Sequence, residues 1–209
     1  MILPPCDPVE LSAAPAKGPD DLVSLTTEAD GAGTARSAAV AAAAEHVAAL
    51  VPAAILNHSR RCYRYAVTSA RAAGLEESSY NDELLYLVCL FHDVAVSAGA
   101  TSGSFEQASA AHATAFMREH GFGQSEISEV QQAITTPTPG PDDTVLARLI
   151  RHGILADAGH NDLVQGATRT RVEARLPRLD YETLIDDAML AHALSPAPDV
   201  TMIQPRRGD

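Results

Sequence analysis

The segment 86–94, Tyr-Leu-Val-Cys-Leu-Phe-His-Asp-Val, joins an apolar run directly to an imidazole and a carboxylate. Burying two such groups at the end of a hydrophobic helix is costly unless a partner compensates for their lost hydration. A metal ion provides that compensation, and a histidine beside an aspartate suits zinc, iron or manganese. His92 and Asp93 are therefore candidate metal ligands, and we expect the rest of the chain to supply more.

His58 is the first of these further candidates. It is predicted to lie on the apolar face of a helix over residues 52–74, one turn from Ile55 and Cys62. A single histidine in such a place is more often an ordinary core residue. A His-Asp pair elsewhere in the chain favours a ligand instead.

Asp157 is the second. It follows Ile-Leu-Ala near the end of a helix predicted over 143–158. A carboxylate at the negative end of a helix dipole is unfavourable unless a cation lies nearby. This position therefore also favours a metal, and three or four such ligands with an open position define a catalytic site.

The composition favours helices throughout. The hydrophobic residues are mainly Ala, Leu and Val, with no Trp, and no segment shows the alternating pattern of a strand. The 209 residues are enough for one well-packed domain, and we predict an all-α fold. The prediction comprises a poorly ordered arm over 1–34, a single domain over 35–195 and a mobile tail over 196–209. The helices are expected over 34–50, 52–74, 80–95, 104–119, 125–135, 143–158, 166–175 and 180–194.

Charge and cysteine content limit the possible partners. The formal net charge of −12 disfavours binding to nucleic acid or to an anionic membrane. No segment has the length and hydropathy of a membrane span. Three cysteines without CxxC spacing fit a reducing compartment, so we expect a cytoplasmic protein in which Cys62 and Cys89 are small core residues.

The order His58, His92-Asp93, Asp157 resembles that of the HD-domain superfamily of metal-dependent hydrolases, and the flanking residues resemble its cyanamide hydratase branch. The segments that carry the resemblance are Asn-His-Ser-Arg-Arg at 57–61, Cys-Leu-Phe-His-Asp-Val at 89–94, Ser-Phe-Glu at 104–106 followed by Gly121, and the segment 149–159. The resemblance runs from about residue 35 to about residue 166. It implies a helical bundle of the HD-domain type and a metal held by His58, His92, Asp93 and Asp157.

The same resemblance bears on the number of metal ions. Two-metal branches carry two further histidines between the His-Asp pair and the last aspartate, and these are missing at 104–107 and at 135–137. His112 and His120 fall elsewhere in the helix pattern and are expected at the surface. We therefore predict one divalent metal ion, with zinc ahead of iron or manganese.

Four positions depart from the hydratase pattern, and all of them should border the pocket. They are Ala95, Val96, Thr135 and Thr136. The chemistry could therefore survive with a substrate other than cyanamide.

Three residues are candidates for catalysis. Asp93 could orient a water molecule as well as bind metal. Arg61 could hold a polar substrate group or stabilise developing negative charge, or else form a surface salt bridge. Glu106 could support a ligand histidine or move a proton, or else simply favour a helix first turn. His152 and His160 flank Asp157 and are expected at the surface or in support of a ligand.

Three functions remain open at this point. The first is a lyase of the cyanamide hydratase type, which adds metal-activated water to a small nitrile-like substrate. The second is a metal-dependent phosphohydrolase, and the third is a non-catalytic accessory protein that keeps the fold. The expected partner is a small molecule, with a homo-oligomer left open.

Overall fold

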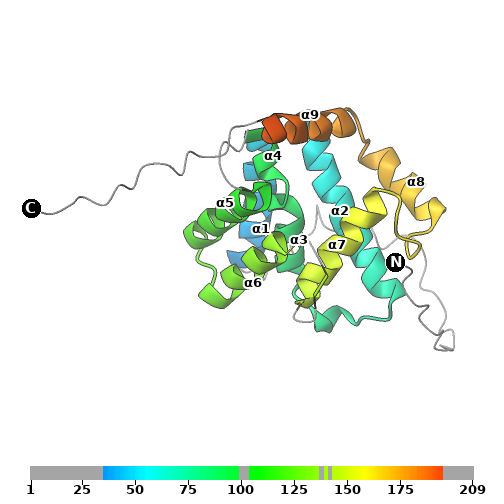
Figure 1. Cartoon of the computed structure of the whole chain (residues 1–209). Coiled ribbons are helices and arrows are strands. Elements are labelled where there is room, and N and C mark those ends of the chain that lie inside the picture. Colours follow the sequence, from blue (N-terminus) through cyan, green and yellow to red (C-terminus); the bar gives the residue numbers. More distant parts are fainter. Residues whose placement is uncertain (1–34, 99–103, 137–138, 141–142, 195–209) are drawn as a thin grey trace, which may run out of the picture. The chain divides into compact units, whose positions relative to one another are not determined.

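The computed structural model describes residues 35–98, 104–136, 139–140 and 143–194. Within these ranges the regular elements are all helical, which confirms the predicted all-α class. In chain order they are α1 (Ala35–Leu50), α2 (Ala53–Ala72), the 3₁₀ helix η2 (Glu77–Ser79), α3 (Asp82–Phe91), α4 (Val94–Ala98), α5 (Phe105–Glu119), α6 (Gln124–Thr135), α7 (Val145–Asp157), α8 (Gly166–Arg175) and α9 (Tyr181–Leu194) (Figure 1). The arm predicted over 1–34, the tail predicted over 196–209 and Cys6 lie outside the described residues. The HD-type arrangement of the helices stays a prediction.

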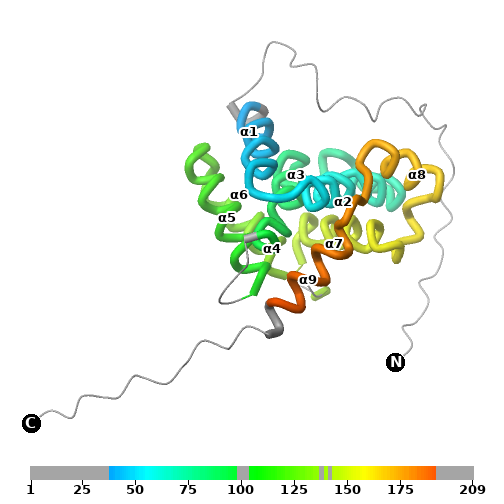
Figure 2. The backbone as a smooth tube through the Cα atoms, turned by 90° about the horizontal axis from the view of Figure 1, so that it is seen from above, coloured from blue at the N-terminus to red at the C-terminus, as the bar shows by residue number. Residues whose placement is uncertain are grey.

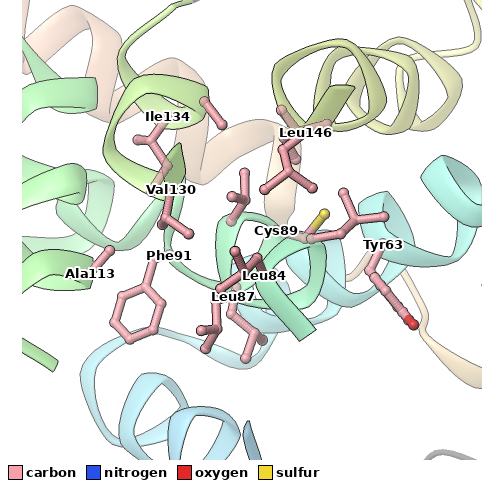
Figure 3. Close-up of a cluster of buried hydrophobic side chains, with 14 of the residues drawn as sticks. Tyr63, Leu84, Leu87, Cys89, Phe91, Ala113, Val130, Ile134 and Leu146 are labelled. Atoms are coloured by element: carbon pink, nitrogen blue, oxygen red, sulfur yellow. The ribbon is translucent and has the colours of Figure 1, made fainter. Parts of the chain in front are cut away.

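Helix α3 is the centre of the core. Its residues from Leu84 to Phe91 are buried on almost every side, apart from Tyr86, as expected for a helix that is apolar around its circumference. Helices α1, α2, α5, α6 and α7 all pack against it. Figure 3 shows Leu84, Leu87 and Phe91 among side chains that come from the surrounding helices. The apolar run that leads to His92 and Asp93 is thus part of the helix against which the others pack.

Side-chain caps set the starts of three helices. The oxygen of Asn81 accepts a hydrogen bond from Leu84 N at 3.2 Å at the start of α3. Ser104 caps α5 and Thr144 caps α7 in the same way. Ser79, which precedes the helix predicted over 80–95, does not cap α3, because it belongs to η2 and the Asn81 side chain two residues later is the cap.

The single helix predicted over 80–95 is two helices. Helix α3 ends at Phe91 and α4 begins at Val94, so that His92 and Asp93 form the turn between them. The ring of His92 accounts for part of this break, since its Nδ1 lies 2.8 Å from the carbonyl oxygen of Cys89 in the last turn of α3. The side chains of His92 and Asp93 therefore lie at the C-terminal end of α3 and not along the side of a longer helix.

Helices α2 and α7 form the most extensive helix pair in the described part of the chain, and they cross very closely. At the crossing, a Cβ atom placed on Gly153 would lie 2.3 Å from the backbone oxygen of Cys62. Backbone cannot move aside as a flexible side chain can, so the crossing requires a glycine at this position. Figure 2 shows the two helices side by side, seen from above.

Gly153→Ala is expected to destabilise the fold, because the added methyl group must push α7 away from α2. The loss in the free energy of unfolding should be at the upper end of the about 1–3 kcal/mol typical of overpacked cores. Chemical denaturation measures it. Gly166→Ala is the matched control, since a Cβ there meets no atom within 4 Å. Equal stability of the two variants would contradict the close crossing.

In the residues that the structure describes, we find no helix with both the length and the apolar character needed to cross a membrane.

Candidate metal centre

One helix and one turn bring three nitrogen and oxygen ligands together. His58 comes from the first half of α2, and His92 and Asp93 come from the turn after α3. The Nε2 atoms of the two histidines are 3.2 Å apart. Asp93 Oδ2 lies 3.3 Å from Nε2 of His58 and 3.4 Å from Nε2 of His92. The three atoms therefore form a nearly equilateral triangle.

The size of this triangle matches the requirement of a tetrahedral metal ion. Ligand atoms about 2.05 Å from a zinc ion lie about 3.3 Å apart at the corners of a tetrahedron. The same distances suit hydrogen bonds and ion pairs between these groups, so the triangle is compatible with a metal ion and does not require one.

Cys62 is a ligand candidate that the sequence analysis missed. It lies one turn after His58 on α2, and its Sγ atom is 3.4 Å from Nε2 of His58. The potential ligand atoms of His58, Cys62 and His92 all lie within 4.8 Å of one another, so this buried group could hold a metal ion. The prediction that Cys62 is a small core residue describes its burial but not its neighbours. The spacing of four residues from His58 on one helix face was the available signal.

The other ring nitrogen of each histidine is already engaged. Nδ1 of His58 lies 2.7 Å from Asp157 Oδ2, and Nδ1 of His92 lies 2.8 Å from the Cys89 carbonyl. A partner that accepts a hydrogen bond from Nδ1 leaves the lone pair on Nε2, which fixes both the tautomer and the ring orientation. Both histidines are thus prepared to donate an Nε2 lone pair toward the same point.

Asp157 and Arg61 form a buried ion pair behind His58. The Nε and Nη2 atoms of Arg61 donate to the two oxygens of Asp157 at 2.7 and 2.9 Å, and the arginine is 0% exposed. Of the two alternatives for Arg61, the surface salt bridge is wrong, because its ion pair lies in the interior where α2 meets α7. In this arrangement Asp157 holds Nδ1 of His58, and its direct coordination of a metal stays a prediction.

The charges of the cluster shift the protonation of its members. Burial would lower the pKa of His58, but the Cys62 sulfur and the hydrogen bonds to Asp157 and Asp93 outweigh it and hold that pKa well above its usual value. Burial would raise the pKa of Asp93, but the His92 and His58 rings hold it well below its ordinary range. Burial acts on Cys62 in the same sense, and His58 nevertheless lowers the pKa of the thiol. Burial would also lower the pKa of His92, but Asp93 and Cys62 raise it. Without a metal the cluster therefore favours protonated imidazoles beside anionic oxygen and sulfur, and a metal ion would bind by replacing the Nε2 protons.

Tyr181 is the second residue that the sequence analysis missed. Its ring stacks on the His58 ring with centroids 4.0 Å apart, and its hydroxyl donates to Asp93 Oδ2 at 3.3 Å. It stands at the start of α9, well after the segment that suggested the other ligands. Within the sequence nothing marks this tyrosine as different from the others.

The remaining predicted residues lie away from these contacts. No hydrogen bond or ion pair among the described residues joins the half-buried Glu106 to the cluster. His120 is exposed and stacks on Phe116, and the half-buried His152 lies near Asn161. His112 is half-buried, and His160 is exposed.

Three of the four positions that depart from the hydratase pattern form hydrogen bonds in the structure. The Ala95 amide donates to Ser109 Oγ in the interior, which ties α4 to α5. The hydroxyls of Thr135 and Thr136 bond back to carbonyls one turn earlier in α6, at Gln131 and Gln132. These threonines therefore act on their own helix end.

Comparison with protein-family models gives no match for this sequence, and neither does a search of curated proteins. The resemblance to the HD-domain superfamily therefore stays a prediction, and the function has to be argued from the site.

Proposed function

We propose that the chain is a metal-dependent enzyme of the hydratase type, which adds water to a small nitrile-like substrate at a single divalent metal ion. The observation that supports this most is the convergence of His58 Nε2, His92 Nε2 and Asp93 Oδ2 at tetrahedral spacing, with both Nδ1 atoms already bonded. We further propose that the site belongs to the HD-domain superfamily, as the order of its residues suggests.

Each residue has a part in the proposed site. When bound, a divalent metal supplies a Lewis acid that acidifies water and polarises a carbon–nitrogen triple bond. His58 and His92 would hold it through Nε2, and their bonds to Asp157 and Cys89 keep the rings from turning. Asp93 is the more open ligand, with 21% of its side chain exposed, and can also accept a proton of the incoming water. The water oxygen then bonds to carbon and a proton goes to nitrogen.

Arg61 positions this site and does not bind the substrate. Its Nε and Nη2 serve Asp157, and its Nη1 donates to the carbonyls of Leu176 and Pro177 at 3.1 and 3.2 Å. Arg178 likewise bonds to Asp157 and Glu173. Because both cations are engaged, the site offers a phosphate ester little positive charge beyond the metal. This argues for a small neutral substrate over the phosphohydrolase alternative.

Cys62 favours a second candidate, a non-catalytic metal site. The triangle of His58, His92 and Asp93 and the group that contains Cys62 have both histidines in common. Four protein ligands close a zinc site and make it structural, whereas three leave the position that a catalyst needs.

Metal content and turnover together test the two candidates. Elemental mass spectrometry of the purified full chain should give about one zinc, iron or manganese ion per chain. Small nitriles, cyanamide among them, should be hydrated by the metal-bound protein, lose turnover after chelation and regain it when one of these metals is returned. A stoichiometric metal without turnover on nitriles or phosphate esters would favour the structural site. Absence of bound metal after reconstitution would overturn both.

A further inference from the structure

Tyr181 lies outside the His-Asp motif but contacts two residues of the cluster, His58 and Asp93. Its ring lies parallel to that of His58, with an interplanar angle of 14°. Its hydroxyl is bonded to Asp93, the ligand with the largest exposed fraction. One side chain thus contacts both the buried and the open side of the centre.

The residues beneath this cover are almost inaccessible. His58 is 3% exposed and His92 is 9% exposed, while Cys62 is fully buried. Asp93 is the part of the cluster that solvent reaches, and it is the atom Oδ2 of this residue that Tyr181 holds. Tyr181 thus contacts both the buried His58 ring and the one member of the cluster that solvent reaches.

The segment before Tyr181 is tied down by polar contacts from α2. Arg61 donates to the Leu176 and Pro177 carbonyls, and Asn57 donates to the Pro177 carbonyl at 3.0 Å. Arg178 bonds to the Asp157 carbonyl on the other side. The buried ion pair that supports His58 thus also anchors the segment that carries Tyr181.

Leu179 shows that this placement is imposed on the chain. Its φ of 54° lies in the left-handed region, the one non-glycine case among the described residues, and its side chain is 58% exposed. This conformation is unfavourable for an L-residue, and the exposed side chain gains no burial in return. The hydrogen bonds of Pro177 and Arg178 therefore hold the backbone in this conformation. Tyr181 follows two residues later, so the same contacts fix its position.

We propose that Tyr181 is the specificity-determining residue of the metal centre. Its ring closes the approach above His58, so that only small molecules reach the metal, and its hydroxyl positions Asp93. This inference rests on the proposed metal-dependent function. It goes beyond that function because it names a residue outside the His-Asp motif that limits the size of the substrate and orients the ligand Asp93.

The kinetics of zinc removal separate the two roles of the side chain. The zinc-bound full chain is mixed with increasing concentrations of pyridine-2,6-dicarboxylate, and the rate of zinc transfer is followed. In the wild type the rate should not depend on the chelator concentration, because the metal must leave before the chelator can bind it. Tyr181→Ala should release zinc about tenfold faster or more, at a rate that rises with chelator concentration.

Tyr181→Phe keeps the ring and removes the hydroxyl. It should weaken zinc affinity by about tenfold, as the loss of a residue that orients a ligand does, while the rate stays independent of chelator concentration. Tyr181→Leu replaces the alanine variant if that variant does not fold, with the same expected concentration dependence. Tyr86→Ala removes another half-buried tyrosine, one that contacts Tyr63, and should change neither quantity.

The outcomes distinguish this inference from the proposed function. Bound zinc with wild-type release kinetics in Tyr181→Ala overturns the role of Tyr181 and leaves the metal site standing. Absence of stoichiometric zinc in the wild type overturns the proposed function, and the inference with it. In the active enzyme, Tyr181→Ala should accept nitriles bulkier than those the wild type hydrates.

Discussion

Replacing His92 with alanine is expected to abolish stoichiometric metal binding. The substitution removes a residue that belongs to both candidate ligand groups, and neither group keeps three ligands without it. Elemental mass spectrometry should show a fall from about one ion per chain to a trace. Hydration of nitriles should disappear in parallel. The fold should survive, because the helices packed around α3 do not depend on the imidazole.

His112→Ala is the matched control for this experiment. His112 lies on α5, away from the converging nitrogens, so that its loss should leave both metal content and turnover unchanged. Circular dichroism of both variants establishes that the helices are intact. Stoichiometric metal in a folded His92→Ala protein would contradict the assignment of the centre.

Replacing Arg61 with leucine should produce the largest loss of stability. The change leaves the Asp157 carboxylate in the interior without its bidentate partner, with only His58 and the more distant Arg178 to compensate. Removal of one partner of a buried ion pair costs about 3–5 kcal/mol. Urea denaturation of the metal-free protein measures this loss, and metal affinity should fall with it because Asp157 orients His58.

The pH dependence of this loss identifies its cause. Burial would raise the pKa of Asp157, but the bonds from His58 and Arg61 hold it well below its ordinary range in the folded wild type. The ionised group therefore stabilises the fold above the unfolded pKa of about 3.9, and this stabilisation disappears as the pH falls. The difference between Arg61→Leu and wild type should shrink in the same direction.

Arg71→Leu offers the control on the same helix. Arg71 and Glu77 form an ion pair of 2.9 Å, but their side chains are 49% and 75% exposed. Exposed pairs contribute about 0–1 kcal/mol, so this variant should be close to wild type. A similar loss in both variants would mean that the burial of the Arg61–Asp157 pair does not determine its contribution.

Local sequence was sufficient for the helices and for part of the centre. Caps such as Ser104 and Thr144 act within one turn, so the helix starts that they set do not depend on the rest of the fold. The burial of α3 likewise follows from its uninterrupted apolar sequence. His92 and Asp93 could be singled out because they are adjacent, and His58 because it lies on an apolar helix face.

Other features needed the tertiary structure, since they depend on which segments meet. The break at His92–Asp93 arises from a bond between the ring and the Cys89 carbonyl, which competes with continued helix. Asp157 reaches Nδ1 of His58 because α2 and α7 cross as closely as Gly153 permits. The sequence pattern of either helix alone cannot predict the short distance between His58 and Asp157.

The sequence by itself thus determined an all-α chain with an unusual His-Asp pair at the end of its central helix. Only the tertiary structure placed Cys62 beside the histidine nitrogens and Tyr181 over His58. The physical reason is the range of the interactions. Helix formation and capping act over a few residues, whereas a metal centre consists of atoms about 3 Å apart that are contributed by distant parts of the chain.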